Sequence, residues 1–161
     1  MPPSVLASLF VISGVIAEAI CAGRKPSAVM KRLQQPRWAL PMGVWYLVGV
    51  SYYAICFAVV YRIARSPRAA AAPLILVAAL MLANAGWNLV FFRLRVLRWS
   101  FWFYVPYILL VIALIWVLWS VDKVSATLLF IYTAYLPYAL VWSYFVLKLN
   151  SPTANETAKS I

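Results

Sequence analysis

Five long apolar runs account for most of this chain. They cover residues 4–23, 38–61, 69–92, 99–121 and 124–147. Each is at least 20 residues long, and an α-helix needs about 20 apolar residues to cross ~30 Å of hydrocarbon. Only helices and closed barrels satisfy their backbone groups inside a bilayer, and barrel strands alternate in polarity, which these runs do not. We predict an all-α integral membrane protein, a five-transmembrane-helix bundle over residues 1–149, followed by a short polar tail at 150–161 that we expect to be disordered.

The basic charge lies in the connectors between these runs. A net charge of +11 could indicate a nucleic-acid partner, but no Lys or Arg lies inside a run. Connectors one and three and the C-terminal side carry ten of the 14 Lys and Arg residues, and the opposite side carries four. The positive-inside rule therefore predicts a cytoplasmic first loop and C-terminus. The expected partner is the lipid bilayer and not nucleic acid.

The first connector is the longest and is large enough to form a lid over one end of the bundle. Its residues 27–33 fit a short interfacial helix, with Val29, Met30 and Leu33 on one face. Pro41 stands where the second helix is expected to begin, a position that proline tolerates. The fourth connector is short, and its Asp122 is expected to cap the fifth helix.

Three prolines lie inside the apolar runs. Each frees a backbone carbonyl and can kink its helix. Membrane helices tolerate such prolines, so two interpretations stay open: neutral prolines, or kinks that open a cavity. The three are Pro73, Pro106 and Pro137.

Aromatic residues are frequent, with 8 Trp and 10 Tyr in 161 residues. Those at the ends of the fourth run fit interfacial belts. Others fall deeper, where they either pack or form the wall of a pocket for a flat apolar ligand. The deeper set is Trp87, Tyr132, Tyr135, Tyr138 and Trp142.

Three polar side chains inside the runs need partners. Asn84 and Asn88 lie one turn apart, and they indicate either an interhelical hydrogen bond or a polar anchor in a cavity. Glu18 is the only acid inside a run. An intramembrane carboxylate is a functional candidate, but Glu18 is also close enough to Arg24 and Lys25 for an interfacial ion pair.

Ala79 and Ala83 form a small-xxx-small pair in the third run. Such a pair lets helix backbones approach closely. It suits internal packing or the seam of a homodimer, and the sequence does not choose between them.

The residues for catalysis are poorly represented. The chain has no histidine, so the usual imidazole base and the commonest metal ligand are absent. No serine or cysteine has an evident base partner, and no metal-ligand spacing appears. We expect a protein that is not an enzyme and requires no cofactor or metal; an enzyme acting on a porphyrin or isoprenoid is the weakest alternative.

The run from Asn84 through Trp87 to Phe91-Phe92 resembles the Asn-x-x-Trp-x-x-x-Phe-Phe signature of the translocator protein / tryptophan-rich sensory protein (TspO/MBR) family. The resemblance covers nearly the whole chain. Further matches in spacing are Val121-Asp122, Tyr132, Lys148-Leu149-Asn150 and the loop residues Leu33, Pro36, Trp38 and Pro41.

This resemblance implies a five-helix bundle, often a homodimer, with a cavity closed by the first loop. It implies a ligand that is a porphyrin, haem or a sterol-like molecule. The ligand-binding residues that it implies are Trp38, Asn84, Trp87, Phe91, Tyr132, Tyr135 and Ala139. A loose sterol motif follows at Val141, Tyr144 and Lys148.

The chain departs from the family pattern at the lid and the pocket wall. Val29-Met30 replaces a Trp-Tyr pair, and Gly49 stands where a tryptophan is usual, with Trp45 one turn earlier. We therefore hold two hypotheses. The first is a membrane receptor or carrier for a flat hydrophobic ligand, with basic loop residues that could attract propionates. The second is a membrane scaffold that regulates a partner protein through its dimer seam or cytoplasmic loops.

Overall fold

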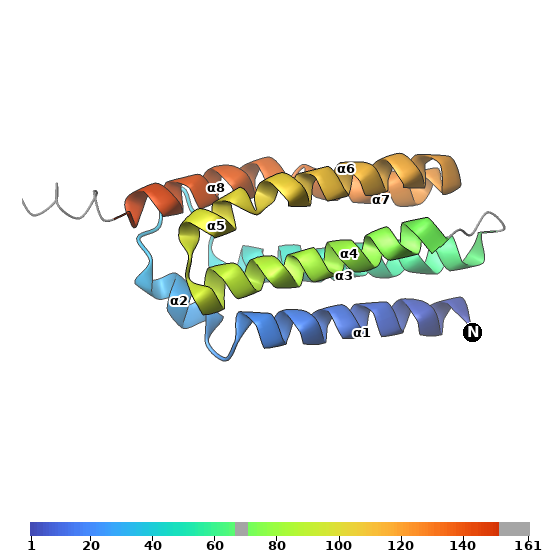
Figure 1. The fold of residues 1–161 in the computed structure, drawn as a ribbon, viewed down its shortest axis with the longest axis horizontal. Helices are drawn as coiled ribbons and strands as arrows, with labels where there is room; N and C mark the ends of the chain where they lie inside the picture. Colours follow the sequence, from blue (N-terminus) through green and yellow to red (C-terminus); the bar gives the residue numbers. More distant parts are fainter. Residues whose placement is uncertain (67–70, 152–161) are drawn as a thin grey trace, which may run out of the picture.

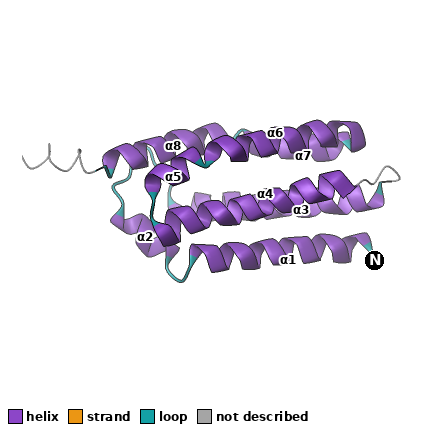
Figure 2. Cartoon of the chain, in the orientation of Figure 1, coloured by secondary structure: helices purple, strands orange, loops and turns teal. Residues whose placement is uncertain are grey.

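The computed structural model describes residues 1–66 and 71–151, and in this part of the chain every regular element is a helix (Figure 2). The elements are α1 (Pro3–Ala22), α2 (Pro26–Arg32), α3 (Met42–Arg65), α4 (Ala71–Asn88) with its π-helical continuation η1 (Leu89–Leu94), α5 (Leu97–Trp102), α6 (Tyr104–Val121), α7 (Lys123–Thr133) and α8 (Leu136–Leu149). Together they make five stretches long and apolar enough to span a membrane. The predicted five-helix bundle is confirmed. Residues 69–70 of the third run and 152–161 of the predicted tail lie outside the described residues.

The second helix, α3, begins at Met42, directly after Pro41 as predicted and four residues after the start of the apolar run at Trp38. Pro41 is its N-cap and has extended backbone angles of φ −63° and ψ 153°. The chain before it therefore stays in the loop. The helix continues past the apolar run, so that Arg62 and Arg65 lie in its last turn.

The fourth and fifth predicted helices are each divided by a break. The ring of a proline clashes with the carbonyl four residues earlier. Helix α5 ends at Trp102, four residues before Pro106, and α7 ends at Thr133, four residues before Pro137. Both breaks therefore have the same cause. Pro73 lies in the first turn of α4, where no helical hydrogen bond is lost.

The spanning helices run lengthwise along one another (Figure 1), and their contacts form a closed ring. Helix α1 packs between α3 and α4, α4 packs on α6, α6 on α7, and α7 on α3. Gly14 allows the close approach of α1 to α4, because a Cβ atom there would lie 2.4 Å from Met81 Cε. The opposite face of α1 exposes Leu9, Ile12 and Ile16, as expected for a face in contact with lipid.

Helix α2 and the C-terminal end of α8 lie at one end of the bundle, and the N-terminus lies at the other (Figure 1). The short helix predicted in the first connector is present, with Met30 buried and Lys31 and Arg32 exposed. The bundle end that carries α2 is the one with the greater basic charge. The orientation in the membrane remains a prediction.

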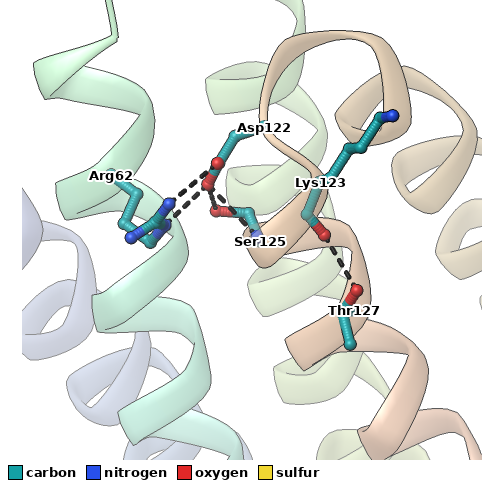
Figure 3. Close-up of polar contacts among 5 residues, drawn as sticks. All are labelled: Arg62, Asp122, Lys123, Ser125 and Thr127. Carbon is teal, nitrogen blue, oxygen red and sulfur yellow. Dashed lines mark hydrogen bonds and ion pairs between the residues drawn. The ribbon is translucent and has the colours of Figure 1, made fainter.

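At the other end, Asp122 joins α3 to the link between α6 and α7 (Figure 3). Its carboxylate accepts from Arg62 Nε at 2.7 Å and Arg62 Nη2 at 2.9 Å. It also caps α7 by accepting from the backbone N–H of Ser125 at 3.1 Å and from the Ser125 hydroxyl at 2.5 Å. The predicted cap is confirmed. The Arg62 guanidinium, together with the Ser125 donors, holds the pKa of Asp122 well below its ordinary value.

Replacing Asp122 with Ala is expected to lower the free energy of unfolding by about 1–2 kcal/mol, because the cap and the ion pair are both lost. Asp122→Asn keeps a capping oxygen and should cost less. The lowered pKa adds a pH dependence: the stabilisation is complete above the ordinary Asp pKa of about 3.9 and is lost as pH falls through the folded-state pKa. Thermal unfolding of the three proteins in one detergent measures this, and equal stability of wild type and Asp122→Ala at neutral pH would contradict it.

Candidate functional site

A cavity of about 220 Å³ lies inside the half of the bundle that α2 covers. Its wall comes from the C-terminal end of α1, the first half of α3, the end of α4, the start of α6 and the junction of α7 with α8. Pro26 and Met30 of α2 close the end. Segments that are far apart in the sequence thus meet around one space.

Two small residues and the proline breaks account for this space. Gly49 lies on the wall, and a Cβ atom there would meet no other atom within 4 Å. Ala139 contributes a methyl group on the opposite helix, α8. Tyr104 and Tyr135 also lie on the wall, beside the breaks in the fourth and fifth spans. The placement of these breaks favours the earlier interpretation that kinks open a cavity.

Aromatic rings make up nearly half of the wall. Trp45 is central, with its ring centroid 4.6 Å from that of Trp142 and 5.9 Å from that of Tyr135. Trp87 stacks on Phe91 at 4.9 Å and 12°. The aromatic residues of the wall are Trp45, Tyr46, Tyr52, Trp87, Phe92, Tyr104, Tyr107, Tyr132, Tyr135 and Trp142. Such a wall suits a flat, apolar molecule.

The polar part of the wall gathers around Glu18. Its Oε2 atom accepts from the Tyr53 hydroxyl at 2.5 Å and from Asn84 Nδ2 at 2.8 Å. Asn88 Nδ2 in turn donates to the backbone oxygen of Asn84 at 2.9 Å. Asn84 thus makes the predicted interhelical hydrogen bond, and it also lies on the cavity wall, where its role as a polar anchor remains a prediction. The expected alternative, an ion pair between Glu18 and Arg24 or Lys25, does not occur among the described residues.

Tyr52, Tyr107 and Tyr132 are three of the tyrosine residues on the cavity wall. Tyr107 and Tyr132 share a hydrogen bond of 3.1 Å. The Tyr52 hydroxyl is buried and finds no hydrogen-bond partner of good geometry in the described part of the chain. The Cys56 thiol, one turn along α3, is a weak acceptor. Because the Tyr52 hydroxyl is buried, it is not exposed to the cavity.

The loop after α2 is fastened to α8 by side-chain hydrogen bonds. The Gln34 backbone N–H donates to Asn150 Oδ1 at 2.9 Å, and Asn150 Nδ2 donates to the Gln34 oxygen at 3.0 Å. Trp142 Nε1 donates to Gln35 Oε1 at 3.0 Å, and the Leu40 N–H donates to the Tyr138 hydroxyl at 2.9 Å. We call helix α2 and residues 33–41 the lid. Helix α2 covers the end of the cavity, and the hydrogen bonds of the following loop attach the lid to α8.

Five of the seven residues predicted to bind ligand lie on the cavity wall: Asn84, Trp87, Tyr132, Tyr135 and Ala139. The other two do not. Trp38 is 44% exposed and packs edge-on against Tyr138 and Phe145, because its loop runs over the outer side of α8. Phe91 is fully buried behind Trp87 and Trp142.

The prediction missed several wall residues. Tyr104 fits the interfacial belt at the start of the fourth run, and Tyr107 is not among the predicted site residues, although their spacing puts them on one helix face. Trp45 and Tyr52, with Gly49 between them, follow the same spacing on α3. This helical spacing is the sequence signal that could have identified the wall. The signal is weak because these helices are apolar on every side, so that the cavity face does not differ in composition from the lipid face.

The predicted sterol motif and dimer seam lie outside the cavity. Val141 and Tyr144 are exposed on the outer face of α8, together with Lys148. Ala79 and Ala83 are partly buried on α4, and Ala83 packs against the core. Sterol binding and dimerisation at these surfaces remain predictions.

Comparison with known proteins gives one positive result. The sequence model of the TspO/MBR family matches residues 5–149, which is nearly the whole chain. A comparison with curated proteins gives no match.

Proposed function

Since the chain belongs to the TspO/MBR family, which supports a membrane ligand-binding or transport role, we propose that it is a non-enzymatic membrane receptor or carrier whose ligand occupies the lidded cavity. The proposed ligand is flat and hydrophobic, a tetrapyrrole such as a porphyrin or haem, with sterol-like molecules as the alternative class. The observation that carries the proposal is the aromatic wall around a cavity that already exists in the folded bundle.

The wall is arranged to hold a planar ring. Trp45 lies on α3 and Tyr135 lies at the junction of α7 with α8, and their rings meet edge-on at 5.9 Å. A flat ligand that displaced this contact would gain ring contacts on both sides, each worth about 0.5–1.5 kcal/mol beyond burial. A few polar groups, Glu18, Asn84 and Asn88, can orient it. Apolar walls with a small number of placed polar groups are typical of ligand sites.

The closed cavity is smaller than a usual ligand site. Its volume of about 220 Å³ is below the ~300–1,000 Å³ typical of such pockets. A tetrapyrrole therefore requires the lid to move. The lid is attached to α8 through polar contacts, which water can replace when they open.

The lid end also carries the charges that an acidic ligand needs. Arg24, Lys25, Lys31 and Arg32 are exposed beside or on α2. Propionate groups of a tetrapyrrole would pair with these side chains at the mouth while the ring enters the cavity. The positive-inside rule also accounts for these charges. They are consistent with the proposal, but the proposal does not depend on them.

The proposal is tested by titrating the protein in nanodiscs with protoporphyrin IX and following tryptophan quenching. Tyr135→Ala removes a wall ring, and we expect it to weaken binding by about fivefold to tenfold, the equivalent of one ring contact. Tyr144→Ala is the matched control, because it removes an exposed tyrosine from the outer face of α8. Absence of saturable binding to wild type, or a larger loss in the control, would reject the cavity as the site.

A further inference from the structure

Glu18 is an unusual component of the cavity wall. It is the only acidic residue within the five spans, and it lies one turn before the end of α1, directly below the lid. Both of its hydrogen bonds end on the same oxygen, Oε2, which accepts from Tyr53 and Asn84. The second oxygen, Oε1, accepts no hydrogen bond within residues 1–66 and 71–151.

The two donors fix the direction of this carboxylate. Asn84 Nδ2 can only donate, and Tyr53 donates from α3, so Oε2 is engaged from two helices at once. The carboxyl group is thereby prevented from turning toward the basic loop. An acidic group within a membrane protein normally pairs with a cation or lines a functional path. No Lys or Arg in the described part of the chain forms an ion pair with Glu18.

We propose that Glu18 Oε1 is a recognition point for a nitrogen-bound hydrogen on the ligand, so that, among the flat aromatic molecules that enter the cavity, those with an N–H donor at one edge bind more tightly, and a protonated amine most tightly. This inference rests on the proposed function, because it takes the cavity as the binding site. Charge-assisted hydrogen bonds of this kind are roughly twice as strong as neutral ones.

The position of Glu18 also gives the bound ligand a direction. Basic side chains lie on the outer side of the lid, and the carboxylate lies on its inner side. A ligand with an acidic group at one edge and an N–H donor at the opposite edge would place the acidic edge outward and the N–H donor inward. A purely hydrocarbon or anionic molecule of the same size would leave Oε1 unsatisfied, at a cost in affinity.

The test uses three probes that share one flat ring system: pyrenemethylammonium, pyrene and pyrenecarboxylate. Each is titrated against the protein in nanodiscs, and binding is followed by energy transfer from tryptophan to pyrene. In the wild type we expect the ammonium probe to bind about tenfold more tightly than pyrene, the gain expected from one charge-assisted hydrogen bond. The carboxylate probe should bind least.

Glu18→Gln keeps an oxygen for Tyr53 and Asn84 but removes the charge. It should abolish the preference for the ammonium probe and leave pyrene binding almost unchanged. Asp122→Asn is the matched control, since it removes one negative charge at the opposite end of the bundle and outside the cavity wall. Comparing proteins in identical nanodiscs cancels partitioning of the probes into lipid.

Each outcome is decisive for one of the two proposals. If neither the probes nor protoporphyrin IX binds wild type saturably, the proposed function fails. If protoporphyrin IX binds but none of the probes does, the role of Glu18 is overturned. If the probes bind but show no ammonium preference, or if Glu18→Gln weakens all three equally, the role of Glu18 is overturned and the proposed function stands. Should Glu18→Gln fail to fold, the wild-type order of the three probes still decides.

Discussion

Gly49→Phe is expected to abolish saturable porphyrin binding while the bundle stays folded. Gly49 lies on the cavity wall, and open space surrounds the position where its Cβ would be. A side chain at this position can therefore leave the backbone without a clash at Cβ, and its ring would point into the cavity space that Gly49 lines. The cavity holds only about 220 Å³, and Trp45, one turn earlier, already occupies the adjacent wall, so little room would remain. We expect affinity to fall by at least about tenfold, or 1.4 kcal/mol.

Gly43→Phe provides a matched control on the same helix. A Cβ at Gly43 also meets no atom within 4 Å, but this residue is not part of the cavity wall. Replacing either glycine with a better helix former should hold or raise helix stability, by roughly 0.5 kcal/mol. The measurement is a protoporphyrin IX titration of both variants beside thermal unfolding. If Gly49→Phe binds as wild type does, the ligand lies elsewhere.

Trp142→Ala is expected to produce the largest loss of stability in the chain. The side chain is completely buried, and its ring lies 4.6 Å from that of Trp45 and 5.5 Å from that of Phe91. Truncating a buried aromatic residue costs about 3–5 kcal/mol, and in a membrane this cost reflects lost packing contacts. The change also removes the donor to Gln35 in the lid. We expect a large fall in the unfolding midpoint together with weaker porphyrin binding.

Trp142→Phe separates these two effects. It keeps an aromatic ring in the core but leaves Gln35 Oε1 without its hydrogen bond, which should cost about 1 kcal/mol. Porphyrin association measured by stopped-flow quenching should become faster than in wild type, because the lid opens more readily. An unchanged association rate would mean that this hydrogen bond does not restrain the lid.

The fold could be predicted from the sequence because the length of each apolar run and the proline positions are local signals. The same is true of the Asp122 cap and of the short helix that became α2. The breaks at Trp102 and Thr133 follow from Pro106 and Pro137 by a fixed offset of four residues. Their position was nevertheless not predicted, since membrane helices often tolerate such prolines.

The site could be predicted only in part, for a physical reason. In a soluble helix, polar residues mark the outer face, but these helices are apolar on the lipid side and on the core side alike. Sequence spacing therefore did not separate Tyr104 of the cavity wall from Trp102, which is exposed. The partners of Glu18, Tyr53 on α3 and Asn84 on α4, depend on the packing of three helices. No local sequence pattern predicts that packing.

The most direct test of the central claim is a crystal structure of the protein with protoporphyrin IX bound. The account predicts ring density inside the bundle, between Trp45 and Tyr135, with the lid displaced and the propionates directed toward the basic residues around α2. Density on the outer face of α8, along Val141 and Tyr144, with the cavity unchanged, would contradict it.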